Sequence, residues 1–82
     1  MELNAGQKIS ITLYHGKDDV EALTILTYLR VLKECNKPIP LMNTGLDIRV
    51  EDVVSESYHL VDKGYTEFKI TLVGELIESK KD

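Results

Sequence analysis

The stretch DDVEALTILTYLRVLKECN, residues Asp18–Asn36, is the longest run without Gly or Pro, and we expect the rest of the chain to pack against it. Its apolar residues recur at helical spacing, which predicts an amphipathic helix. Asp18 has the character of a capping residue at the start, and Pro38 stops the helix. The predicted buried stripe is Ala22, Ile25, Leu26, Leu29 and Leu32. Further apolar residues widen it: Val20, Leu23, Tyr28, Val31 and Cys35. We therefore expect this helix to be covered on more than one side.

The composition is that of one small domain, expected to span residues 1–82 with the ends 1–7 and 79–82 frayed. No run is long enough to span a bilayer, and the first residues lack the apolar core of a secretory signal, so we expect a cytoplasmic protein without a membrane partner. The net charge of −4 argues against strong sequence-independent attraction to phosphate. The single Cys35 is expected to be a small buried apolar group and not a ligand or nucleophile.

Strict alternation predicts two strands. The first is Lys8–Tyr14, with Ile9, Ile11 and Leu13 on its inner face. The second is Thr66–Val73, with Phe68, Ile70 and Leu72 facing inward. Between them, Ile39–Asn43 is read as a short edge strand, because Pro38 and Pro40 both lack the N–H of a ladder member; a plain loop is the alternative.

A second helix is predicted over Glu51–Lys63. One side of this predicted helix recurs at i, i+3, i+4, i+7, i+8 and i+11, and its members are Val50, Val53, Val54, Ser57, Tyr58 and Val61. The opposite side is acidic, with Glu51, Asp52, Ser55, Glu56, His59 and Asp62. Gly64 then fits the position after the last helical turn.

The expected order is therefore β-α-β-α-β, an α/β two-layer sandwich with a short or missing fourth strand. A strand–helix–strand unit favours a parallel pair with a right-handed crossover. Open sheet edges and the very apolar first helix favour a homodimer.

This arrangement resembles the Alba family of small archaeal chromatin and RNA-binding proteins. The resemblance rests on Gly16-Lys17 at the first turn, on the Gly-x-x-Ile spacing of Gly45–Ile48, and on Gly74 where a hairpin loop would start. It implies a dimer that binds DNA or RNA. The candidate nucleic-acid-binding residues are Lys8, Lys17, Asn43, Thr44, Gly45 and Arg49. The chain departs from the family in having one Lys at the first turn, Thr44 where Arg is usual, and no basic hairpin arm, so we expect binding to be weak and salt-dependent.

Other readings stay open. Lys17 can instead pair with Asp18 or Asp19, and Asn43 and Thr44 can simply make a turn. The main alternative function is a protein-interaction or regulatory module whose partner binds the acidic face of the second helix, and a weaker one is a winged-helix regulator. No activated nucleophile, carboxylate pair or metal-ligand pattern is evident, so we expect no enzyme activity, no catalytic or metal-binding residues and no cofactor.

Overall fold

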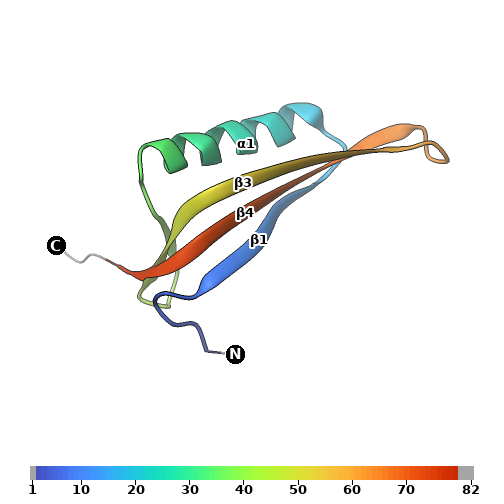
Figure 1. Cartoon of the computed structure of the whole chain (residues 1–82). Helices are drawn as coiled ribbons and strands as arrows, with labels where there is room; N and C mark the ends of the chain where they lie inside the picture. Colours follow the sequence, from blue (N-terminus) through green and yellow to red (C-terminus); the bar gives the residue numbers. More distant parts are fainter. Residues whose placement is uncertain (1, 80–82) are drawn as a thin grey trace.

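Four strands and one helix make up the fold of this computed structural model, which describes residues 2–79 (Figure 1). The elements are β1 (Lys8–Gly16), α1 (Asp19–Glu34), β2 (Ile39–Leu41), β3 (Leu46–Leu60) and β4 (Tyr65–Glu78). The strands form one curled antiparallel sheet in the order β1-β4-β3-β2. Helix α1 lies along one face of this sheet, and the other face is open (Figure 1).

Helix α1 confirms the prediction for Asp18–Asn36. The Asp18 carboxylate accepts hydrogen bonds from the backbone N–H groups of Val20 (3.0 Å) and Glu21 (3.1 Å), which satisfies donors that the first helical turn leaves free. Its buried residues are Ala22, Leu26, Leu29 and Leu32, with Ile25 half-buried beside them. The predicted stripe is therefore the face that packs on the sheet.

The predicted second helix is wrong, because Glu51–Lys63 instead belongs to β3 and its turn. The helical spacing arises from a β-bulge between Val50 and Asp52, where two residues of β3 oppose one residue of β4. The extra residue resets the alternation, so Val50 and Val53 both face the helix although they are three apart. Val54 then faces the opposite side, opposite Thr71 of β4. A strand with a bulge thus imitates the first half of a helical stripe.

The predicted role of Gly64, at the end of a second helix, is also wrong. Gly64 has a φ of +75° and donates its N–H to the Leu60 carbonyl at 2.8 Å, closing the loop that joins β3 to β4. A left-handed glycine can follow a helix or close a hairpin, and here it closes a hairpin. The hairpin extends well past α1 and β1 as an arm (Figure 1).

The two remaining predicted strands are confirmed, with one change of face. Strand β4 includes Thr66–Val73 and continues through Gly74 to Glu78. Strand β1 starts at Lys8 as predicted, but a bulge between Thr12 and Tyr14 turns Leu13 outward, where it is 44% exposed, and places Tyr14 against the core.

Strand β2 confirms the short strand at Ile39, but its neighbour differs from the prediction. It pairs antiparallel with β3, through Ile39 opposite Ile48 and Leu41 opposite Leu46, and lies at the edge of the sheet furthest from β1. No parallel β-α-β unit exists among residues 2–79. The predicted β-α-β-α-β two-layer sandwich, on which the resemblance to the Alba family rests, is therefore wrong.

The core lies between α1 and the inner face of the three long strands. Leu29, Ile70, Leu72 and Leu76 are its most buried side chains. At the start of the chain, Gly6 N–H donates to the Leu76 carbonyl at 2.6 Å, and Leu76 N–H donates to the Gln7 carbonyl at 2.9 Å. Fraying is also predicted for residues 80–82, which lie outside the described residues.

Candidate interaction surface

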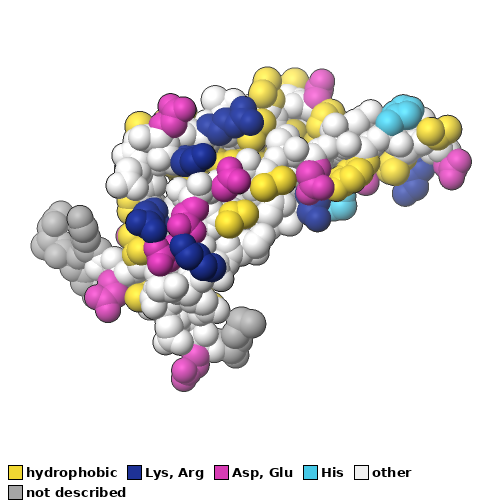
Figure 2. All heavy atoms as spheres, viewed as in Figure 1, with side chains coloured by type: hydrophobic (Ala, Val, Ile, Leu, Met, Phe, Trp, Pro, Cys, Tyr) yellow, Lys and Arg dark blue, Asp and Glu magenta, His cyan; other side chains and the backbone are white. Residues whose placement is uncertain are grey.

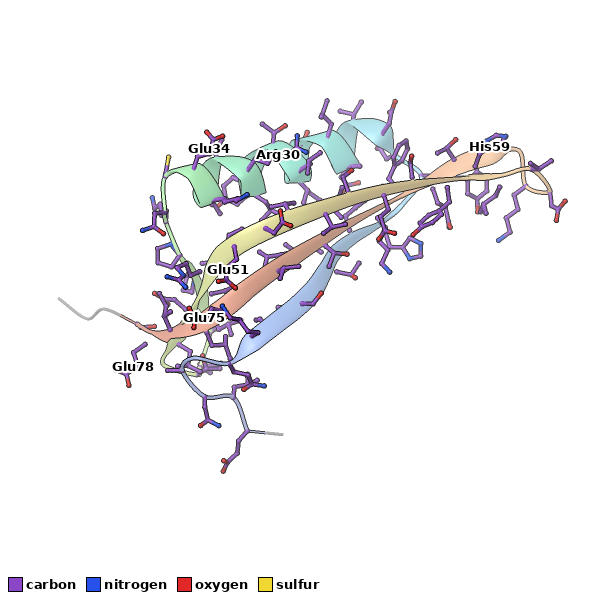
Figure 3. The ribbon with its side chains drawn as sticks, viewed as in Figure 1. Arg30, Glu34, Glu51, His59, Glu75 and Glu78 are labelled. Carbon is purple, nitrogen blue, oxygen red and sulfur yellow. The ribbon has the colours of Figure 1, made fainter. Side chains whose placement is uncertain are left out.

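Two of the predicted nucleic-acid contacts, Lys8 and Arg49, lie side by side on the open face of the sheet, but both are engaged by carboxylates. Lys8 Nζ is 2.7 Å from Glu51 Oε2 and 4.0 Å from Glu75 Oε2. Arg49 Nη2 pairs with Glu75 and lies 3.6 Å from Glu51 Oε2. Figures 2 and 3 show this mixed group of charges, with Glu51 and Glu75 directed out from the sheet. Two cations and two carboxylates cancel, so the group presents no net positive charge to a phosphate.

Lys17 lies far from this group along the sheet. Gly16 pairs with Phe68 of β4, whereas Lys8 pairs with Glu75. The Lys17 ammonium sits 5.2 Å from the centre of the Tyr65 ring, an arrangement that favours a cation–π contact. Neither Asp18 nor Asp19 forms the alternative ion pair with Lys17 in residues 2–79.

The predicted turn residues Asn43, Thr44 and Gly45 form the β2–β3 connection, at the opposite end of the sheet from Lys17. The Thr44 hydroxyl donates to the Leu41 carbonyl at 2.9 Å and accepts from Leu46 N–H at 3.1 Å. Asn43 and Gly45 hold the positive φ values of 67° and 73° that the turn requires. The six predicted contacts thus fall into three separate places, and weak nucleic-acid binding that is lost in Lys17→Glu stays a prediction.

The most unusual surface is the outer face of α1, which we define as Val20, Leu23, Thr24, Thr27, Tyr28 and Val31. Its four large apolar side chains are 70%, 62%, 62% and 51% exposed for Val20, Leu23, Tyr28 and Val31. The hydroxyl of Thr24 donates to the Val20 carbonyl at 2.8 Å, so this threonine has already satisfied its donor. Figure 2 shows hydrophobic side chains at the upper edge of the molecule over the first half of the helix, with charged side chains on the visible flank. A charge-free apolar stripe of this length is typical of a contact surface.

The outer face continues into a groove at the C-terminal half of α1. The groove has a volume of ≈ 420 Å³ and lies between the helix and the chain that leads into β2. Tyr28, Val31 and Cys35 form its helix side, and Ile39 and Pro40 its other side. The predicted burial of Cys35 is therefore wrong, because this residue is exposed at the end of the helix. The apolar surface therefore extends from the helix to the start of β2.

The charges beside the outer face are unevenly distributed. Asp19 and Glu21 lie in the first turn of α1, whereas Arg30 and Lys33 lie in its second half, with Glu34 after them (Figure 3). Lys33 Nζ is 3.9 Å from Asp52 of β3. Asp19, Glu21 and Arg30 form no ion pair within residues 2–79, so their charges remain free for a partner.

One tyrosine on the hairpin arm is electrostatically perturbed. The Tyr58 hydroxyl donates a hydrogen bond to the Glu56 carboxylate, and this bond raises the pKa of Tyr58 above its ordinary value of 10.0. Burial and the negative charge of Glu56 act in the same direction. No group of three or more His, Cys, Asp or Glu residues able to hold a metal ion occurs between residues 2 and 79. Likewise, in that part of the chain no helix is long and apolar enough to cross a membrane.

The sequence reasoning identified the excess of apolar residues on α1 but not their exposure. The signal was the pair of stripes on one helix, because a single sheet can cover only one of them. No protein-family model, curated protein or solved structure matches the chain.

Proposed function

We propose that this protein is a non-enzymatic protein-interaction module whose contact surface is the outer face of α1. The observation that supports the proposal is the exposure of Val20, Leu23, Tyr28 and Val31 in one charge-free stripe. Burying an exposed apolar side chain of this size in a complex is favourable by roughly 1.5–3 kcal/mol, so four of them supply a strong drive for association. The acidic face expected of a second helix plays no part, because that helix does not form.

Site-specific photo-crosslinking in cells tests this proposal. A benzophenone amino acid replaces Thr27, at the middle of the outer face, and in a matched control it replaces Ser10, which is exposed on the open face of the sheet. We expect the Thr27 probe to form protein adducts, and Leu23→Ser together with Val31→Ser to remove them. Adducts no more abundant at Thr27 than at Ser10 would overturn the proposal.

A further inference from the structure

Resting on the proposed function, we infer that the partner of the outer face of α1 is a second copy of this chain, bound with the two helices antiparallel and crossing. Three features of the helix support this occupant: its charge distribution, its shape and its residue pattern. In each of these features, the outer face of one copy matches that of the second copy only when the two helices run in opposite directions.

The charge distribution favours the antiparallel arrangement. Asp19 and Glu21 lie at the start of α1, and Arg30 lies in its second half, one turn before Glu34 at the end of the helix. Reversing the second helix brings the acidic first turn of each copy beside Arg30 of the other. A parallel arrangement would place like charges together, which is destabilising. The antiparallel arrangement also opposes the two helix dipoles, which is favourable.

The shape favours it as well. Val20 and Leu23 stand out from the first half of the helix, at 70% and 62% exposure, and Tyr28 and Val31 stand out from the second half, at 62% and 51%, with the groove beside them. A two-fold axis places Val20 and Leu23 of each copy over Tyr28, Val31 and the edge of the groove in the other. Such an interface is isologous, because every contact occurs twice and the assembly closes at two copies.

The residue pattern gives a register. With Thr24 opposite Thr27 of the second copy, Val20 falls opposite Val31, and Leu23 falls opposite Tyr28. Every large apolar side chain of the outer face then meets another, and the small threonines occupy the centre, where the helices approach most closely.

The expected affinity is modest. A helix of 16 residues is about 24 Å long, so the contact supplies only part of the roughly 800 Å² per partner of a typical stable interface. We therefore expect a dimer that forms in the micromolar range and dissociates on dilution.

Sedimentation velocity with a charge swap tests the inference. One variant carries Asp19→Lys and Glu21→Lys, and the other carries Arg30→Glu. Each homodimer would oppose like charges at both ends, so we expect each variant alone to sediment as a single chain at concentrations where the wild type dimerises. In an equimolar mixture both ends become complementary again, so we expect the mixture to recover the dimer. Recovery also shows that both variants remain folded.

The possible results separate the inference from the proposed function. A wild type that stays a single chain to about 500 µM, well above the range in which mass action should populate the dimer, would overturn the second-copy inference. So would a mixture that dimerises no better than its components. If the Thr27 probe then forms adducts with other proteins, the interaction module stands without the second copy. Thr27 adducts of twice the chain mass, cross-linked within Val20–Val31, would support both.

Discussion

Gly74 and Gly64 require glycine for two different reasons, a close approach of the backbone at Gly74 and a left-handed backbone conformation at Gly64. A Cβ atom on Gly74 would lie 2.6 Å from the Arg49 carbonyl oxygen and 2.8 Å from Ile48 Cγ2, because the bulge of β3 presses against β4 at that point. A Cβ atom on Gly64 would meet nothing within 4 Å, and only its φ of +75° favours glycine there.

Gly74→Ala should therefore destabilise the protein by about 1–3 kcal/mol, the usual cost of overpacking a close contact. Gly64→Asn is the matched control, and we expect it to cost less than about 0.5 kcal/mol, because Asn tolerates the left-handed region and the site is open. Urea unfolding measures both changes. Equal losses in the two variants would contradict the steric explanation.

At the same scale, the hairpin arm offers a test of the Tyr58 hydrogen bond. The neutral phenol donates to the Glu56 carboxylate, so the bond stabilises the protonated form and raises the pKa. In Glu56→Ala the Tyr58 pKa should fall toward 10.0, as followed by NMR of the ring resonances through an alkaline titration. Glu34→Ala, on the helix, should leave it unchanged. A Tyr58 pKa that does not respond to Glu56→Ala would show that the bond is absent in solution.

At the scale of elements, β3 shows how a bulge can make a strand resemble a helix. Val53 and Val54 would share one stripe of a helix, but in β3 they face opposite sides of the sheet. Val53 packs against the core opposite Leu72, whereas Val54 is 38% exposed opposite Thr71.

Threonine substitutions distinguish the two arrangements. Val53→Thr should cost about 1–2 kcal/mol, because it places a hydroxyl against the apolar core, while threonine keeps the shape and β-branching of valine. Val54→Thr should change the free energy of unfolding by less than about 0.5 kcal/mol. Chemical denaturation gives both values. Similar losses at the two positions would indicate a helix.

At the scale of the whole molecule, the sheet can bury only one of the two apolar faces of α1. The sheet buries the stripe of Ala22, Leu26, Leu29 and Leu32, and the outer face is left to solvent or to a partner. The open sheet face differs, because paired charges occupy one end of it, and its exposed Leu13 and Val54, at 44% and 38%, are less exposed than the large apolar side chains of the outer face of α1. Association through the helix is therefore the favoured route to further burial.

Association should couple stability to concentration. We expect the thermal midpoint of the wild type to rise by a few degrees as the protein concentration increases about a hundredfold, because the dimer holds the folded state by mass action. Leu23→Ser should show a midpoint that does not depend on concentration. Differential scanning calorimetry measures both. An invariant wild-type midpoint would contradict dimerisation coupled to folding.

The sequence by itself determined α1 and its buried stripe, β1, β4 and the short β2. Each depends on local information: the helical or alternating period, the Asp18 cap and the two prolines that follow the helix. The apolar excess on the helix was equally readable, and it is the feature from which the candidate surface is built.

Only the tertiary structure decided the conformation of residues 46–60 and the order of the strands. Pairing with β4 commits that segment to a strand, and the pairing partner lies at residues 65–78, so no local period reveals it. The bulge removes even the alternation that would have pointed to a strand. The strand order also decided where the predicted contacts lie, because it set Lys8 and Arg49 on either side of Glu75 and left Lys17 and Thr44 elsewhere on the sheet. Strand pairing joins residues that are far apart in the sequence, and it depends on how much apolar side-chain area the whole sheet buries.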